Sequence, residues 1–283
     1  MSFGVRSLSV SLDAVEVLHA VDLDVPAGSV VAVVGGDGAG KSTLLRCLVG
    51  KLVPSAGEVH RPDRQLVGYM PSTSGTWRQL TVTENVDFVG GAFRMSASKL
   101  EQRRTELLHR AKLTAATDRL AGQLSGGMRH KLGFVLAMLH EPDLLVLDEP
   151  STGVDPVSRV ELWRLIAEAA AGGTAVAMAT TYLDEAERAS SVSVLDDGRV
   201  IAAGTRDSIM KSFPGFITAP QRAAVANRTW RRNGELREWH PNTDHADVGR
   251  QLLPDDLEFE DVVIARLLAD RLAMPTGHER AGT

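Results

Sequence analysis

The stretch VVAVVGGDGAGKSTLLRCLVG, residues 30–50, predicts a buried strand, a glycine-rich loop and a helix in that order. Residues 30–34 are short in extent, apolar and mostly β-branched, which is typical of a strand buried on both faces of a parallel sheet. Residues 35–40 end the strand, and the apolar residues of 42–49 recur at helical spacing. This order of elements predicts an α/β fold around a parallel sheet.

The glycine-rich loop matches the pattern G-x-x-x-x-G-K-S/T, and it has the strand and helix that this pattern requires on either side. Glycines let backbone N–H groups surround phosphate oxygens, and the helix N-terminus adds partial positive charge. Lys41 is expected to reach the β- and γ-phosphates of a nucleotide and Ser42 to hold magnesium. A glycine-rich turn without a ligand is the alternative, against which the Lys-Ser pair argues. The predicted nucleotide-binding residues are Gly35, Gly36, Asp37, Gly38, Ala39, Gly40, Lys41, Ser42 and Thr43.

A second apolar run, LLVLD at residues 144–148, predicts another buried strand, and it ends in two carboxylates. Asp148 would lie beside the phosphate loop and bind magnesium through water. Glu149 points differently and would polarise an attacking water as a general base. A strand that ends in Asp-Glu is weak evidence alone, but behind a phosphate loop it predicts a site that hydrolyses a nucleotide.

The segment LSGGM, residues 124–128, leads into a predicted helix at residues 129–139. Ser125 is a good helix N-cap. Gly126 and Gly127 leave backbone N–H groups free at the helix start, which makes a second anion-binding surface. The residues alone leave open the alternative of a capped helix without a binding role.

Phosphate loop, LSGG and LLVLDEP in this order and spacing resemble an ATP-binding cassette (ABC) ATPase. The resemblance implies a P-loop NTPase with a parallel-sheet core, an antiparallel β subdomain, a helical subdomain insertion and a small C-terminal accessory segment. It implies ATP and Mg²⁺ as cofactors, clamped at a head-to-tail dimer interface where Ser125, Gly126 and Gly127 of one subunit face the γ-phosphate held by the other. STGVDP, residues 151–156, matches the dimer-contact loop of the family, with Asp155 as the expected interface residue.

The resemblance covers residues 1–215, and TYLDEAE at 181–187 with DGRV at 197–200 is similar to drug-efflux and multidrug subgroups. It implies a subunit that hydrolyses ATP and powers a transporter, an exporter by subgroup likeness, through ATP-driven dimer closure. The expected partners are separate transmembrane permease subunits and a second ATP-binding cassette, identical or different. The chain is then expected to be cytoplasmic and peripherally associated with the inner face of the cell membrane.

Four positions depart from the pattern of the family. Leu12 stands near the aromatic residue that stacks on adenine, and a core role is the alternative interpretation. Ser72 stands where a glutamine touches magnesium, so it is a doubtful metal ligand that could reach only through water. Met128 replaces a glutamine. Thr181 replaces the switch histidine and can donate a hydrogen bond but cannot carry charge.

Glu149 and Thr181 are therefore the predicted catalytic positions, and the depleted donors predict slow hydrolysis. The alternative is a catalytically weak regulatory or structural subunit that pairs with a complete cassette. The sequence does not identify the transported substrate.

Composition agrees with a folded protein that does not bind nucleic acid as its main partner. The 283 residues are 43% hydrophobic and 24% charged, and the net charge of −5 disfavours a phosphate backbone. No run approaches the roughly 18 to 20 apolar residues of a spanning helix. The start of the sequence lacks the pattern of a secretory signal. Cys47, the only cysteine, lies in an apolar run and is expected to be an inert core residue.

The rest of the chain divides into a helical insertion, further strands and a C-terminal segment. Residues 81–140 are rich in helix formers, and the helical subdomain is expected at about 72–140. Beyond about residue 213, PGFITAPQR at 214–222 is expected to be a linker. The linker and accessory segment, residues 216–283, are expected to end in a short helix within 257–273. The other predicted elements are strands at 5–10, 19–25, 175–180 and 191–195, and a helix at 159–171.

Overall fold

The computed structural model describes residues 1–213, 215–220, 225–241, 251–253 and 256–273. The chain forms two compact units, residues 1–200 and 201–283, and the division falls within strand β9 (Arg199–Gly204). The expected domain boundary at residue 215 lies beyond this division and stays a prediction.

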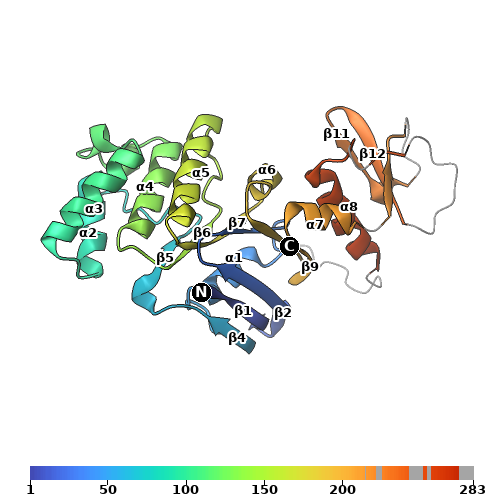
Figure 1. Cartoon of the computed structure of the whole chain (residues 1–283), viewed down its shortest axis with the longest axis horizontal. Coiled ribbons are helices and arrows are strands. Elements are labelled where there is room, and N and C mark those ends of the chain that lie inside the picture. The colour runs from blue at the N-terminus through green and yellow to red at the C-terminus, as the bar shows by residue number, and fades with distance from the viewer. Residues whose placement is uncertain (214, 221–224, 242–250, 254–255, 274–283) are drawn as a thin grey trace. The chain divides into compact units, whose positions relative to one another are not determined.

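Six strands form one sheet in the order β5-β6-β7-β3-β8-β9 (Figure 1). The pairs β5/β6, β6/β7, β7/β3 and β3/β8 are parallel. All residues of β3, β6 and β7 are buried, which explains why these strands are continuous apolar runs in the sequence. The prediction of strands at 30–34, 144–148 and 175–180 is confirmed. The bounds are β3 Val30–Val34, β5 Val67–Met70, β6 Leu144–Asp148, β7 Ala175–Thr180 and β8 Ser191–Asp196.

A separate antiparallel sheet has the order β2-β1-β4, formed by β1 (Ser2–Leu12), β2 (Val15–Pro26) and β4 (Ala56–His60). Asp13 and Ala14 join β1 to β2 with φ values of 48° and 67°. Positive φ at both turn residues suits the twist of a two-residue hairpin. The first two strands are longer than the predicted segments at 5–10 and 19–25.

Helix α1 (Lys41–Leu48) lies between the two sheets and contacts strands of both (Figure 1). Its apolar residues Leu44, Leu45 and Leu48 are completely buried. Each leucine contributes about 2 kcal/mol by leaving water. This burial fixes the start of α1, and with it the loop that precedes the helix.

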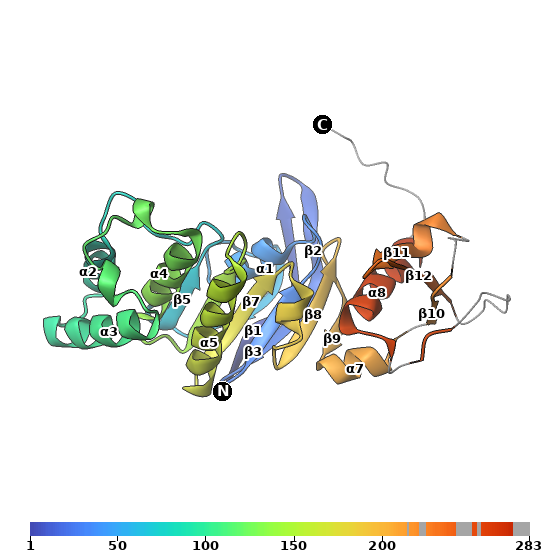
Figure 2. The same cartoon turned by 90° about the horizontal axis from the view of Figure 1, so that it is seen from above.

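Helices cover the other face of the parallel sheet, as Figures 1 and 2 show for α5 over β7. A capping box between Thr81 and Glu84 starts α2, and α2 and α3 contact each other and α4. These helices lie in the region where a helical insertion is expected. The bounds are α2 Val82–Ala92, α3 Ala97–Arg110, α4 Gly126–Met138, α5 Pro156–Ala171 and α6 Leu183–Ala186.

Within its described residues, the second unit contains an antiparallel sheet in the order β10-β12-β11 and two α-helices. Strand β10 lies inside the segment PGFITAPQR, so the prediction that this segment is only a linker is wrong. Ile217 pairs with Trp239 and both are buried, which is the long-range contact that turns the segment into a strand. The bounds are α7 Arg206–Lys211, β10 Phe216–Thr218, β11 Thr229–Arg232, β12 Glu235–His240 and α8 Phe259–Ala273.

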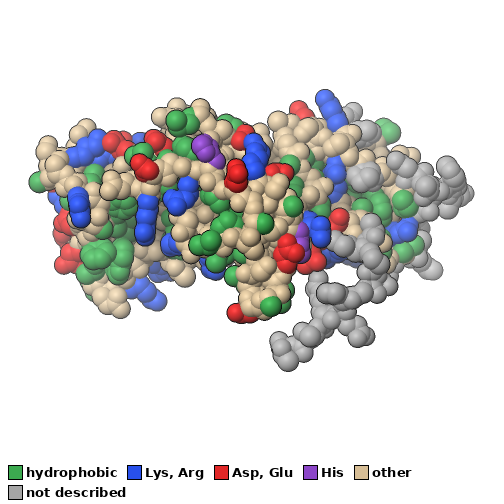
Figure 3. Space-filling model, turned by 90° about the horizontal axis from the view of Figure 1, so that it is seen from below, with side chains coloured by type: hydrophobic (Ala, Val, Ile, Leu, Met, Phe, Trp, Pro, Cys, Tyr) green, Lys and Arg blue, Asp and Glu red, His purple; other side chains and the backbone are tan. Residues whose placement is uncertain are grey.

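The surface is mixed in charge where it can be seen: on the face drawn in Figure 3, Lys and Arg side chains lie among Asp and Glu side chains. Of the helices within the described residues, none has both the length and the apolar character of a membrane span.

Candidate functional site

The parallel register brings the predicted site residues to one edge of the sheet. Val34 pairs with Thr180, and Asp148 pairs with Ala179. The residues that follow these strands, Gly35, Thr181 and Glu149, therefore leave the sheet at the same carboxyl edge. Such an edge is where open α/β sheets bind ligands.

The phosphate loop forms an open cradle above this edge. Gly40 has φ 102°, and a Cβ there would lie 2.6 Å from Leu18 Cδ2, so the loop can turn into α1 only with glycine. A Cβ on Gly36 or Gly38 would meet nothing within 4 Å. The space over these two glycines fits phosphate oxygens.

The remaining loop residues differ in what they can offer to a ligand. Asp37 is exposed and Thr43 is half-buried on the first turn of α1. Ala39 is 3% exposed and its N–H donates to Gly36 O at 3.2 Å. A Cβ on Gly35 would lie 2.1 Å from Leu195 O, so this glycine allows a close approach of the backbone to β8.

Lys41 places its ammonium between the loop and the carboxylate of Glu149, the residue that follows β6. Its Nζ donates to the carbonyl oxygens of Gly35 and Gly36 at 2.9 and 3.0 Å. The same Nζ lies 3.6 Å from Glu149 Oε1. The Lys41 side chain is only 7% exposed, so its charge acts in a site partly shielded from water.

Ser42 and Asp148 place two side-chain oxygens next to each other beside the loop. Ser42 Oγ donates to Asp148 Oδ1 at 2.9 Å, and Asp148 is 1% exposed. No cluster of three or more His, Cys, Asp or Glu able to hold a metal occurs within the described residues. Mg²⁺ commonly uses one or two protein oxygens and completes its shell with phosphate and water. The pair fits Mg²⁺ bound together with a nucleotide.

Ser72 follows β5, where Met70 pairs with Leu147 beside the end of β6. It is exposed and forms no hydrogen bond with another described residue. Its role as a metal ligand stays a prediction.

Glu149 is held in place by three hydrogen bonds to one carboxylate oxygen. Its Oε2 accepts from Thr152 Oγ1 at 2.9 Å and from both N and Oγ1 of Thr181 at 3.4 Å. The residue has φ 51°, which lies in the left-handed region. The structure thus brings together Glu149 and Thr181, the two predicted catalytic residues. Thr152 is not among the predicted site residues; its hydroxyl, three residues after Glu149, is the feature of the sequence that indicates this contact.

Ser125, Gly126, Gly127 and Asp155 form a second cluster. Ser125 Oγ accepts from Met128 N at 3.2 Å and caps α4. Asp155 caps α5 by accepting from Ser158 N at 3.0 Å, and hydrogen bonds from the backbone and side chain of Ser158 lower the pKa of the Asp155 carboxyl. No hydrogen bond within the described chain joins this cluster to residues 35–43.

The positions that depart from the family pattern differ in how exposed their side chains are. Leu12 is 40% exposed at the end of β1, so the alternative interpretation of Leu12 as a core residue is wrong. Met128 is half-buried and Thr181 is exposed. Cys47 is 1% exposed, so the prediction that it lies in the core is confirmed, and burial raises its pKa to about 11; the inertness of the thiol stays a prediction.

Comparisons with known proteins agree with this geometry. A family model described as "ABC transporter" matches residues 18–152. The chain is 38% identical over 213 residues to the probable multidrug ABC transporter ATP-binding protein YbhF of Escherichia coli (strain K12), covering 71% of this chain. It spans only 37% of the length of that relative.

Two other matches extend over most of both chains. The daunorubicin resistance ATP-binding protein DrrA2 of Streptomyces coeruleorubidus is 32% identical over 94% of this chain and 92% of its own length. A solved structure described as an ATP-binding subunit of an ABC transporter is 31% identical, with a TM-score of 0.69 over 75% of this chain and 92% of its own. The predicted fold class is confirmed, and the chain belongs to the ATP-binding proteins of the ABC transporter family.

Proposed function

We propose that this chain binds ATP with Mg²⁺ and hydrolyses it to power an ABC exporter. The observation that carries the proposal is the position of Lys41 Nζ, between the carbonyl oxygens of the phosphate loop and the carboxylate of Glu149. A cation there can neutralise the terminal phosphates while the adjacent carboxylate receives the proton of a water.

Each residue of the site then has a definite task. Gly36 and Gly38 leave room for the phosphate chain, and Lys41 shifts from its carbonyl partners to the β- and γ-phosphate oxygens. Ser42 and Asp148 hold Mg²⁺, which neutralises phosphate charge when bound. Glu149, oriented by Thr152 and Thr181, accepts a proton from the attacking water.

A second cassette completes the site. We assign Ser125, Gly126, Gly127 and Asp155 to the interface between two cassettes, where the free N–H groups at the start of α4 suit the γ-phosphate held by the other subunit. Closure with ATP and opening after hydrolysis then move the permease subunits. The second cassette is either a copy of this chain or a different one.

Export is supported by the names of the relatives. They include proteins described as multidrug, daunorubicin resistance and Nod factor export ATP-binding proteins. We place the chain on the cytoplasmic face of the membrane, bound peripherally to permease subunits. We assign residues 1–215 to the ATP-binding domain, with its helical subdomain at about 72–140, and residues 216–283 to an accessory segment.

A second candidate function is a nucleotide-binding subunit with weak turnover. Thr181 favours it, because its hydroxyl lies 3.4 Å from Glu149 and offers no charge to a γ-phosphate. Leu12 favours it as well, because an exposed aliphatic side chain offers no stacking surface to a base.

Steady-state ATP hydrolysis by the purified chain tests both candidates. Glu149→Gln should abolish turnover and preserve binding of MgATP. Glu141→Gln is a matched control, because Glu141 also has a positive φ, 58°, but pairs with Lys99 instead. If the parent is slow, Thr181→His should raise kcat. A fast parent that gains nothing from Thr181→His contradicts the expectation of slow hydrolysis, and a parent no faster than Glu149→Gln contradicts hydrolysis itself.

Copurification from detergent-solubilised membranes tests the link to a transporter. A tagged chain expressed in its own host should retain a hydrophobic permease through washing. Recovery of the chain only from the soluble fraction, with and without ATP, contradicts the transporter role.

A further inference from the structure

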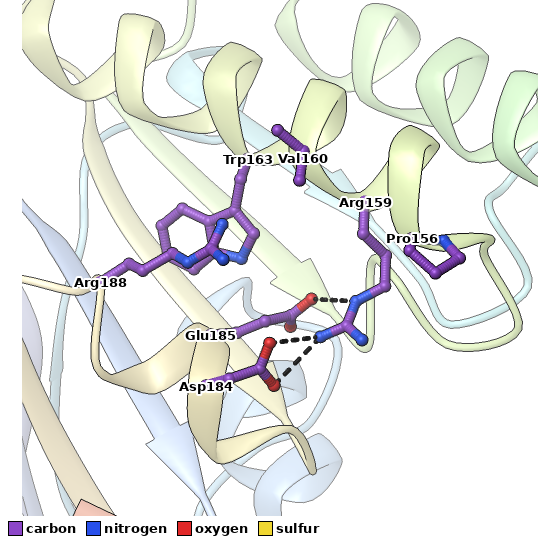
Figure 4. Close-up of a pocket in the computed structure, with 7 residues that line it drawn as sticks. All are labelled: Pro156, Arg159, Val160, Trp163, Asp184, Glu185 and Arg188. Atoms are coloured by element: carbon purple, nitrogen blue, oxygen red, sulfur yellow. Dashed lines mark hydrogen bonds and ion pairs between the residues drawn. The ribbon is translucent and has the colours of Figure 1, made fainter.

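A pocket of about 140 Å³ between α5 and α6 contains an ion-pair network in which one carboxylate is buried (Figure 4). Arg159 of α5 points across the pocket to two acids of α6. Its Nε donates to Glu185 Oε1 at 3.3 Å, and its Nη2 donates to the two oxygens of Asp184 at 3.1 and 2.9 Å. Neither acid nor the arginine has a part in the site described above.

The two acids differ in burial and in what they hold. Asp184 is 60% exposed, whereas Glu185 is 1% exposed. Glu185 Oε2 accepts from Thr180 Oγ1 at 2.7 Å, and Thr180 Oγ1 accepts in turn from Tyr182 N at 3.1 Å. The guanidinium of Arg159 also lies over the Tyr182 ring, 4.2 Å from its centroid. Arg159 and Glu185 therefore hold both neighbours of Thr181.

Thr181 itself faces the opposite way, toward Glu149. Its N and Oγ1 donate to Glu149 Oε2, as described above. Residues 180–182 thus alternate between contacts with Glu185 or Arg159 and contacts with Glu149. A shift of the flanking residues changes the distance between Thr181 and Glu149.

At its other end, the network reaches Asp155 in the loop of residues 151–155, here called the Asp155 loop. Arg159 lies one helical turn after Asp155, and its N–H donates to Asp155 O at 2.9 Å. A continuous set of hydrogen bonds and one ion pair therefore runs from Asp155 through Arg159 and Glu185 to the backbone beside Thr181.

We propose that Arg159 and Glu185 are positioning residues that couple the Asp155 loop to the Thr181–Glu149 pair. The proposal rests on the function proposed above, in which Asp155 lies at the contact between two cassettes. A movement of this loop on contact with the second cassette displaces the start of α5, and the arginine passes the displacement to residues 180–182. Glu149 is then correctly placed only when the second cassette is present.

The burial of Glu185 should make its position depend closely on that of Arg159. A carboxylate that is 1% exposed is strongly destabilised when its cation partner is removed, so Glu185 is expected to follow the guanidinium when Arg159 moves. Because the same carboxylate accepts from Thr180 Oγ1, its displacement also moves Thr180. Loss of Arg159 is therefore expected to misplace Thr181 without touching the phosphate loop.

Kinetics of four variants test the proposal. Arg159→Ala and Glu185→Gln should lower kcat about tenfold, within the hundredfold that a 1 Å misplacement can cost. Their KM for MgATP should stay within about twofold of the parent, because neither residue contacts residues 35–43. Arg159→Lys fits the open pocket and should recover part of kcat. Asp184→Asn is the matched control, since Asp184 binds the same guanidinium but does not contact Thr180, and its kcat should stay within about twofold.

Amide hydrogen exchange over residues 180–185 provides a measurement that does not depend on turnover. This segment should exchange at least about tenfold faster in Arg159→Ala than in the parent or in Asp184→Asn. Parental kcat in Arg159→Ala and Glu185→Gln overturns the proposal, whatever the exchange rates are. A rise in KM at constant kcat also overturns it. If Arg159→Ala does not fold, Glu185→Gln and Arg159→Lys decide, since both retain a hydrogen-bonding group in the pocket.

The failure of the proposal and that of the proposed function are distinguishable. A parent with no more activity than Glu149→Gln contradicts hydrolysis. An active parent whose Arg159 and Glu185 variants are equally active contradicts the coupling alone.

Discussion

Gly127 lies so close to α5 that alanine at this position should force the two helices apart. A Cβ on Gly127 would be 2.3 Å from Ser158 Oγ, 2.4 Å from Ser158 Cβ and 3.2 Å from Asp155 Oδ2. The first two distances are more than an ångström below contact distance, and Ser158 Cβ is fixed to the backbone of α5. Gly127→Ala is therefore expected to shift the start of α4 away from the Asp155 loop.

The magnitude follows from two opposing effects. Overpacking a close contact costs about 1 to 3 kcal/mol of unfolding free energy. Alanine recovers up to about 1 kcal/mol over glycine through helix propensity, and less in the first turn, where Gly127 lies. The net destabilisation should be about 1 to 2 kcal/mol. In a domain of this size that lowers Tm by about 2 to 8 °C.

Urea and thermal unfolding followed by circular dichroism measure this effect, and Gly126→Ala is the matched control. A Cβ on Gly126 would lie 3.3 Å from Gly153 O, a tight contact but one without a clash. Ser158→Gly should relieve the clash, so a double-mutant cycle of Gly127→Ala with Ser158→Gly should give a favourable coupling of at least about 1 kcal/mol. Full stability of Gly127→Ala, or a coupling within about 0.3 kcal/mol of zero, refutes the reasoning.

Three further predictions concern separate features. Lys41→Ala removes the ammonium beside Glu149, and the loss of charge-assisted hydrogen bonds should weaken MgATP binding roughly 10- to 100-fold in calorimetric titration; unchanged affinity would contradict the assigned role. Cys47 should react with Ellman's reagent at pH 8 only after unfolding in urea, because with a pKa of about 11 only about a thousandth of the thiol is ionised even before burial blocks access. Burial lowers the pKa of His130, whose Nδ1 lies 2.5 Å from Pro150 O, so stability should fall as pH drops below about 6.5, where the unfolded chain takes up a proton that the folded chain excludes. His130→Gln should reduce the difference in urea midpoint between pH 7.5 and pH 5.5, and an unchanged difference would exclude His130 as its source.

The parallel core was predictable from the sequence because each of its central strands is buried along its whole length. Continuous apolar runs at 30–34, 144–148 and 175–180 need no knowledge of distant contacts. The sheet of the second unit was not predictable in the same way. Its strand β10 is three residues long and depends on the pairing of Ile217 with Trp239, which a local pattern cannot reveal.

The candidate site also has a part that local sequence predicts and a part that it does not. Short motifs beside a buried strand contain Lys41, Ser42, Asp148 and Glu149. The strand sets the geometry of each motif, so the sequence indicated these residues directly. The contacts of Glu149 with Thr181 and of Glu185 with Arg159 join residues that are 32 and 26 positions apart. The first contact follows from the register of the parallel strands β6 and β7, and the second from the contact between α5 and α6; no local pattern in the sequence records either.

The left-handed backbone of Glu149 has a consequence for how the protein tolerates change. A φ near 51° costs a residue with a Cβ about 1 to 2 kcal/mol of folding free energy, whereas it costs glycine almost nothing. Selection for thermal stability alone should therefore favour glycine or asparagine at this position. The selected variants would be more stable but would not hydrolyse ATP. A screen for stability alone would therefore remove the Glu149 carboxylate, on which the proposed hydrolysis depends. The backbone angle of this one residue sets stability against activity.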